Sequence, residues 1–261
     1  MIVHYGGVIA DKSSERLSSD AVPALFSYSL NRATRKLYTG DYFQFRQGST
    51  IKEYPSDSID PNQTAYLVKL YDQKEKHSVP VRDAVQLDQS KQPEIVEQNG
   101  YLRAVFDQNE YLDIEVQDLA PFIGQNFTIT SIGDGGDFPR PMIGIWGSSD
   151  RITVEPSDQV TRFTFNGNLG TILDSDGSVT QCYSGPSIEV SQERIIEVNS
   201  GVDHGRLSIT AQNPDLTHIS IGREDQRLYK GDFSEATMHL GELTRLGSEQ
   251  LFSTTRAYYG Y

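Results

Sequence analysis

Acidic residues close to glycine-rich turns are the first candidates for chemistry in this sequence. Hydrolysis of a glycosidic bond needs one carboxyl group with a raised pKa and a second carboxylate about 5–10 Å away. Five acids stand near such turns at expected strand ends: Asp134, Asp137, Asp203, Glu224 and Asp225. The alternative is that they are solvated loop acids in a chain of net charge −13. The sequence leaves both interpretations open.

An aromatic side chain offers a second kind of chemistry, the recognition of sugars. Trp146 is the only tryptophan and stands between Gly144 and Gly147. Its ring could stack on the apolar face of a sugar, while carboxylates bind the hydroxyl groups; the alternative is a core residue with a satisfied indole N–H. We predict no catalytic residue, and we take four residues as candidates for ligand binding: Asp137, Trp146, Glu224 and Asp225.

Metal binding has weaker support. Asp174–Gly177 (DSDG) resembles the start of an EF-hand loop, but position 12 of that loop would be Gly185 instead of glutamate. Asp134–Asp137 (DGGD) is a second oxygen-rich turn. The five histidines show no zinc-binding spacing, and the single cysteine, Cys182, excludes a multi-thiolate zinc site and an internal disulfide framework. We predict no cofactor, with Ca²⁺ as the one candidate metal.

Composition narrows the class of partner. With 23 Lys and Arg against 36 Asp and Glu, the charge argues strongly against a nucleic-acid binder, which would need a basic patch for the phosphates. The same charge disfavours docking on an anionic membrane, and no apolar run is long enough to span one. No secretory signal is visible, and one cysteine suits assembly in a reducing cytoplasm.

The elements that would position these residues are mostly strands. Apolar and polar residues alternate in several short runs, such as Thr161–Phe165 and His218–Ile221, and turn residues separate them. Many short strands predict an all-β sandwich or barrel. We expect nine side chains on the inner faces: Phe43, Phe45, Leu67, Leu70, Phe163, Phe165, Ile209, Ile219 and Ile221. Two stretches look helical, residues 24–30 and 248–258.

An ordered set of sequence landmarks resembles a known family. The first hundred residues contain, in order, Ala24–Leu30 (ALFSYSL), Leu37–Arg46 (LYTGDYFQFR), Tyr66–Gln73 (YLVKLYDQ) and Gln92–Val96 (QPEIV), and Phe106-Asp107 follows. Their order is similar to the N-terminal sandwich of the α-L-arabinofuranosidase B family and to related modules in phage virion proteins. The C-terminal Tyr229–Glu235 (YKGDFSE) segment and the YG ending resemble concanavalin A-like laminin-G and lectin modules.

The resemblance implies an all-β, concanavalin A-like (jelly-roll) sandwich of two antiparallel sheets with one or two short helices. We expect this sandwich to span residues 21–261, with residues 1–20 as an N-terminal arm or docking segment. Tyr71 and Asp72 of the landmark block are expected to be structural. Asp72 can accept backbone N–H groups at a strand end through an Asx-type turn.

The catalytic pattern of that family is not matched. The family places its nucleophilic glutamate in a strand resembling MEAIYFG, but Pro141–Gly147 (PMIGIWG) has Ile143 or Gly144 at that point. Its acid lies in an IGGD segment, where Ile221–Asp225 (IGRED) offers acids. Because one carboxylate cannot perform a two-carboxylate mechanism, the resemblance does not carry the enzymatic activity over.

The leading hypothesis is therefore a non-enzymatic phage virion protein of the tail, fibre or baseplate region. It would be structural or adhesive and present in many copies or as a homo-oligomer, in contact with other virion proteins and with host surface glycans. It would assemble in the host cytoplasm, bind no nucleic acid and not insert in a membrane. One alternative is an arabinofuranosidase-like hydrolase using Glu224 or Asp225 with a partner such as Asp137. Another is a ligand-free cement or collar subunit.

Overall fold

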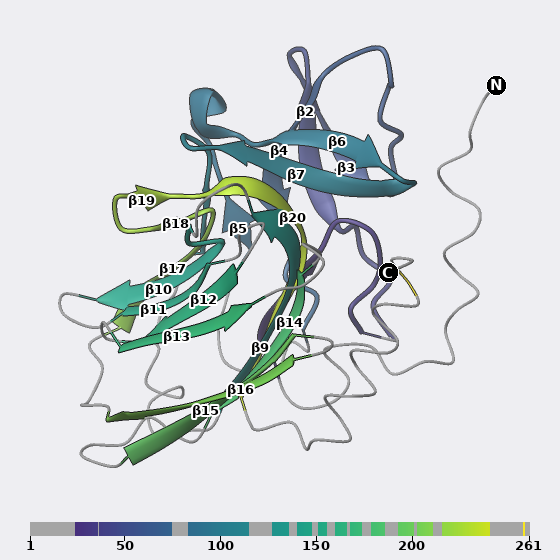
Figure 1. The fold of residues 1–261 in the computed structure, drawn as a ribbon. Coiled ribbons are helices and arrows are strands. Elements are labelled where there is room, and N and C mark those ends of the chain that lie inside the picture. The colour runs from purple at the N-terminus through teal and green to yellow at the C-terminus, as the bar shows by residue number, and fades with distance from the viewer. Residues whose placement is uncertain are drawn as a thin grey trace.

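The computed structural model describes residues 24–35, 37–74, 83–114, 127–135, 140–147, 151–155, 160–165, 168–173, 179–185, 193–200, 203–210, 216–240 and 258. At the described residues between 160 and 216, and at residues 127, 128, 130, 134, 135, 239 and 240, it describes the backbone only. Within these ranges the strands pair antiparallel and form two curled layers (Figure 1). This confirms the predicted all-β sandwich.

The first layer is built around the long strand β20. β9 pairs with one side of β20, β1 and β7 pair with the other, and β14, β15 and β16 continue the layer beyond β9. The bounds of these strands are β1 Ala24–Ser29, β7 Tyr101–Asp107, β9 Phe127–Gly135, β14 Val179–Gly185, β15 Glu193–Ser200, β16 Asp203–Thr210 and β20 Lys230–Leu240.

The second layer runs in the order β5–β8–β17–β10–β11–β12–β13. Its strands are β5 Ala84–Val85, β8 Leu112–Ile114, β10 Ile143–Gly147, β11 Arg151–Glu155, β12 Val160–Phe165, β13 Asn168–Leu173 and β17 Leu216–Ile221. A small hairpin, β18 (Arg223–Glu224) and β19 (Arg227–Leu228), follows β17.

A lobe of short strands joins the layers at one end (Figure 1). It contains β2 Phe43–Gln47, β3 Thr50–Tyr54, β4 Ala65–Leu70 and β6 Glu94–Gln98, with a 3-10 turn at Gln89–Lys91. β4 pairs with β2, β5 and β6, and β6 pairs with β7, so the lobe is continuous with both layers. In the described part of the chain, no helix is long and apolar enough to cross a membrane.

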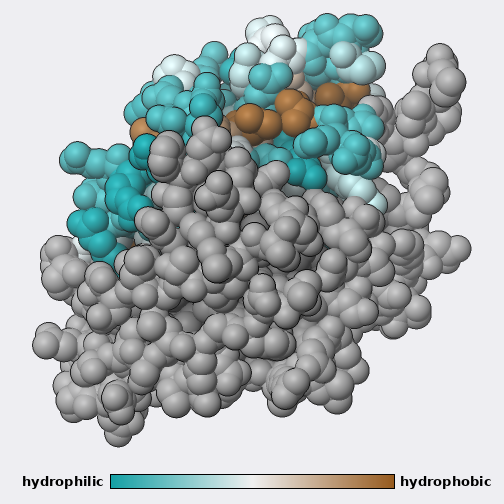
Figure 2. All heavy atoms as spheres, in the orientation of Figure 1, coloured by the Kyte–Doolittle hydropathy of each residue, from teal (hydrophilic) through white to brown (hydrophobic). Residues whose placement is uncertain are grey.

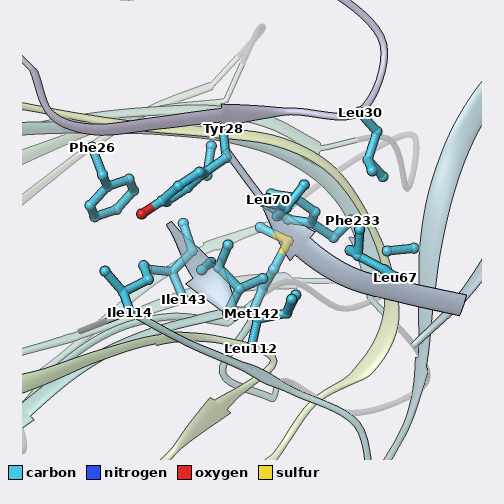
Figure 3. Close-up of a cluster of buried hydrophobic side chains, with 14 of the residues drawn as sticks. Phe26, Tyr28, Leu30, Leu67, Leu70, Leu112, Ile114, Met142, Ile143 and Phe233 are labelled. Atoms are coloured by element: carbon cyan, nitrogen blue, oxygen red, sulfur yellow. The ribbon is translucent and has the colours of Figure 1, made fainter. Parts of the chain in front are cut away.

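The core lies between the layers (Figure 3). Phe26, Tyr28 and Phe233 of the first layer face Ile114 and Ile143 of the second, and all five side chains are buried. Six of the nine predicted inner-face residues are at most 1% exposed, which confirms them: Phe43, Phe45, Leu67, Leu70, Ile219 and Ile221. The side chains of Phe163, Phe165 and Ile209 lie outside the described residues.

The helix predicted for residues 24–30 is wrong, because Ala24–Ser29 form strand β1. All six residues are buried, so the segment shows no alternation, and a short run buried on both faces cannot be told from a helix by its period. Its serines are satisfied inside the protein, since Ser27 Oγ lies 2.7 Å from the hydroxyl oxygens of Thr34 and Thr237.

The other predictions for the chain ends fall mostly outside the described residues. Of the second predicted helix, residues 248–258, only Tyr258 is described, and its backbone is helical. Residues 1–20, the predicted arm, are also outside. The division into an arm and a sandwich therefore stays a prediction.

Candidate functional site

The candidate site lies on the outer face of β8, β17, β10 and β11. Ile143 and Ile145 of β10 point into the core, so the alternation of a strand places Gly144 and Trp146 on the opposite side. The registers set the neighbours of these two positions. Asp113, Ser220, Gly144 and Thr153 form one row across the strands, and His218, Trp146 and Arg151 form the next. We call this surface the outer face.

The β18–β19 hairpin packs directly on the outer face at Gly144. A Cβ atom placed on Gly144 would lie only 2.8 Å from the Cβ of Glu224 and would collide with the carbonyl oxygen of Arg223. The hairpin turns at Asp225, whose φ of 52° is in the left-handed region that Asp tolerates. Glycine at position 144 is thus what allows the hairpin to approach the strand.

Two buried glutamates and two arginines form an ionic cluster beneath this hairpin. The side chains of Glu155 and Glu224 are 2% and 0% exposed, whereas those of Arg151 and Arg227 are 44% and 43% exposed and cover them. Arg227 donates to both oxygens of Glu155, at 2.7 and 2.9 Å, and to Glu224 at 3.3 Å. Arg151 Nη1 lies 2.7 Å from Glu224 Oε1. We call these four residues the ionic cluster.

The electrostatics of the ionic cluster combine opposing effects. Burial raises the pKa of Glu224, while the nearby guanidinium groups of Arg151 and Arg227 act to lower it. Glu155 also accepts a hydrogen bond from Thr153 Oγ1 at 2.8 Å. Because one guanidinium nitrogen contacts both carboxylates, their nearest oxygens are at most about 6 Å apart, which is comparable with the spacing of glycosidase carboxyl pairs.

The chemistry of the ionic cluster depends on the positions of its arginines. A carboxyl group with a raised pKa beside a second carboxylate is the arrangement of an acid and a nucleophile or base. Here Arg227 occupies both oxygens of Glu155, and charge-assisted bidentate pairs of this kind are strong. With the arginines in place, the cluster therefore stabilises the hairpin and offers neither carboxylate to a substrate.

Trp146 lies within a stack of side chains on the same face. It is 7% exposed, and its ring is nearly parallel to that of His218, with 5.3 Å between centroids. The Arg223 guanidinium lies 5.7 Å from the Trp146 ring and 3.9 Å from that of Tyr111. Asp113 holds Arg223 through two contacts of 2.7 Å. The tryptophan therefore takes part in a stack within the protein.

Three of the four predicted ligand-binding residues come together here. Glu224 is buried in the ionic cluster, and Trp146 is on the neighbouring row of the outer face. Asp225 is exposed at the hairpin turn, with its carboxylate 3.9 Å from Arg151 Nη2. Asp137 lies outside the described residues, so its pairing with Glu224 or Asp225 stays a prediction. The side chains of Asp134 and Asp203 are not described either.

Glu155, Arg151 and Arg227 were not among the residues predicted from the sequence. A signal for the first two was present, because β11 alternates strictly (Arg-Ile-Thr-Val-Glu) and thus places Arg151, Thr153 and Glu155 on one face. No local signal pairs Glu155 with Arg227, since the two are 72 residues apart in the chain.

Metal binding gains no candidate from the described residues. Among them, no group of three or more His, Cys, Asp or Glu side chains could hold a metal ion. The DSDG segment at 174–177 lies outside the described residues. Ca²⁺ binding at that segment or at Asp134–Asp137 is therefore untested.

Comparison with solved structures identifies the fold. The chain is similar to an arabinofuranosidase complexed with arabinofuranosyl-α-1,2-xylobiose, with a TM-score of 0.65 and 14% sequence identity over 89% of this chain and 62% of that one. It is also similar to a mutant GH54 α-L-arabinofuranosidase soaked with 4-nitrophenyl α-L-arabinofuranoside, with a TM-score of 0.66 and 14% identity over 94% and 63% of the two chains. This chain thus spans less than two thirds of their length.

These matches establish a fold and not a family. No family profile matches this sequence, and no curated protein does. The arabinofuranosidase-like sandwich expected from the landmarks is therefore confirmed as a fold, while the comparison with phage modules rests on the landmarks alone. The two segments compared with the family's MEAIYFG and IGGD patterns do lie in contact here, at Gly144 and Glu224.

Proposed function

We propose that this protein is a non-enzymatic, glycan-binding β-sandwich. The ionic cluster carries the proposal, because Glu224, in the segment compared with the family's acid, and its neighbour Glu155 are both covered and paired by Arg151 and Arg227. The likeness of the fold to arabinofuranosidases supports carbohydrate as the ligand class. A sandwich of this fold whose carboxylates are closed off can retain recognition of sugars without cleaving them.

Two measurements on the purified chain test this proposal. We expect binding on a glycan array that includes arabinoxylan oligosaccharides, and no release of 4-nitrophenol from 4-nitrophenyl α-L-arabinofuranoside. The absence of binding to any glycan would contradict the proposal and favour the ligand-free cement or collar subunit. Turnover that is lost in Glu224→Gln would contradict the non-enzymatic part.

A hydrolase is the second candidate, and the Glu155–Glu224 pair specifically favours it. The raised pKa of Glu224 suits a general acid, and Glu155 would be the second carboxylate. Arg227 would have to leave Glu155 for a substrate to enter. Under this hypothesis Glu224→Gln and Glu155→Gln each abolish turnover, whereas Asp107→Asn, an exposed acid in β7, leaves it unchanged.

The biological setting that we propose is a phage virion, in the tail, fibre or baseplate region. The sequence landmarks support this setting, together with an acidic chain of one cysteine. Many copies, in contact with other virion proteins, would convert weak single-site glycan contacts into avidity. Immunogold labelling of virions tests this placement, and particles that carry no label would contradict it.

A further inference from the structure

We propose that a groove in the lobe, remote from the ionic cluster, is a binding site for a neutral saccharide. This inference rests on the proposed glycan binding and names its location. The groove has a volume of about 360 Å³ and lies between the β3–β4 loop, residues 59–64, and strand β6. That volume falls within the range of small-molecule sites, which combine an apolar base with a few placed polar groups.

The base of the groove is apolar. Tyr54, Ile95 and Leu102 are buried beneath it, and the partly exposed side chains of Ile59 and Val96 complete the lining. Figure 2 shows small apolar areas on the surface of this lobe, with hydrophilic residues beside them. A sugar ring has an apolar face of C–H groups, and burying such a face against aliphatic side chains is favourable.

The loop that forms one wall is fixed before any ligand binds. The Gln47 side chain accepts from the Asp60 backbone N–H and donates to the backbone carbonyls of Asp60 and Gln63, at 2.9–3.1 Å. The Asp60 carboxylate accepts from the Asn62 backbone and from the side-chain amides of Asn62 and Gln63, at 2.8–3.0 Å. Asp60 is thus a positioning residue, and the pre-ordered loop lowers the entropic cost of binding.

The rim retains both donors and acceptors. Asn62 and Gln63 each use one amide hydrogen on Asp60, which leaves each with a second N–H and a carbonyl oxygen. No hydrogen bond from another described residue to these groups is present, and the exposed residue Glu94 of β6 also lines the groove. A hydroxyl group donates one hydrogen bond and accepts two, so mixed amide and carboxylate rims match polyols.

The charge of the groove selects among ligands. Asp60, Glu94 and Glu97 line it, and its lining contains no Lys or Arg. Sugars that carry a carboxylate would be repelled, so the structure favours neutral ones. A cationic peptide would also match the charge. Its ammonium groups would use only the acceptors of the rim, whereas a sugar ring can use the amide donors and acceptors through its hydroxyl groups and the apolar base through its C–H face.

The site is tested with paired variants of the whole chain. Asn62→Ala combined with Glu94→Ala removes rim groups from two exposed positions, and Asn109→Ala combined with Asp107→Ala is the matched control outside the groove. The probes are xylotriose, cellotriose and arabinotriose, with glucuronic acid-substituted xylotriose and oligolysine for comparison. Binding is measured by titration calorimetry and by NMR shifts of the side-chain amides.

We expect the unmodified chain to bind at least one neutral trisaccharide, the groove variant to bind it at least tenfold more weakly, and the control variant to bind unchanged. Two outcomes would show that the groove is not the site while leaving the proposed glycan binding intact. In the first, the chain binds glycans on the array and the groove variant binds them equally well. In the second, Asp225→Asn on the outer face abolishes that binding. Preference for the glucuronic acid probe or for oligolysine also overturns the inference. The absence of binding to every glycan overturns both proposals.

Discussion

At the scale of single residues, Asp72 shows how a landmark position stabilises the fold. Its Oδ1 accepts hydrogen bonds from the backbone of Ser27 at 3.0 Å and of Lys74 at 3.2 Å. The second bond is the Asx-type turn predicted from the sequence. Asp72→Ala would leave the Ser27 N–H buried without an acceptor, at a cost of about 1–3 kcal/mol. Urea denaturation should show this loss, and a smaller loss for Asp72→Asn, which keeps an acceptor oxygen.

Asp72 also predicts a dependence of stability on pH. Burial raises the pKa of its carboxyl group from 3.8 to about 7, against the opposing charge of Lys74. Because the folded-state pKa is raised, the contribution of this group is fully present below pH 3.8 and is lost as the pH rises through about 7. The stability of the wild type relative to Asp72→Asn should therefore fall between pH 4 and pH 8. A difference that rises over this range would contradict the assignment.

Arg227 is expected to stabilise the ionic cluster. Arg227→Met would leave Glu155 without its bidentate partner, and breaking such a buried pair costs about 3 kcal/mol, the low end of the usual range because Arg227 is itself half-exposed. Lys230→Met is the control, because its pair with Asp107 is exposed and should contribute less than about 1 kcal/mol. Chemical denaturation at neutral pH compares the two, and equal losses would refute the proposed role.

At the scale of elements, the contact of β10 with the β18–β19 hairpin depends on one missing side chain. Gly144→Ala would push a methyl group against Glu224 and the Arg223 backbone, and overpacking of this kind costs about 1–3 kcal/mol. Gln226→Ala, at the exposed hairpin turn, should be close to neutral. Thermal unfolding measures both. A Gly144→Ala protein as stable as the wild type would show that the hairpin can move away freely.

Tyr258 contacts the residues that directly follow β1. Its hydroxyl donates to the Asn31 carbonyl oxygen at 3.0 Å, and its ring lies 4.7 Å from the Arg32 guanidinium. Arg32 in turn forms two buried bonds of 2.7 and 2.8 Å with Glu235. We expect Tyr258→Phe to cost about 1 kcal/mol and Tyr258→Ala to cost about 2–3 kcal/mol, since it also loses a large, partly buried ring. Denaturation curves of the two variants should keep this order.

Strands differed in how well the sequence predicted them. Alternation identified β17, and the apolar positions of β2 and β4 were correctly assigned to the core. The prediction for β1 failed because both faces of this strand are buried, so its sequence lacks the alternation of apolar and polar residues that marks a half-exposed strand. The groove and the ionic cluster could not be predicted, because each joins segments that only the strand registers bring together, as with Glu155 and Arg227.

At the scale of the whole molecule, the two layers should unfold as one unit. β20 pairs with β1, β7 and β9, and the lobe is hydrogen-bonded to the first layer through β6–β7 and to the second through β4–β5. Opening either layer would therefore break its hydrogen bonds to the shared lobe. Differential scanning calorimetry should show one transition whose calorimetric and van't Hoff enthalpies agree. Two separate transitions would show that the sandwich divides into independent parts.

The pairing of β1 with β20 also bears on how the protein is made. Ser27 and Thr237, which touch across these strands, are 210 residues apart. A ribosome delivers β1 well before its partner strand, so the nascent chain must carry an unpaired apolar segment until β20 has emerged. Chains that stop before β20 would expose that segment permanently, and we expect them to be insoluble or held by chaperones.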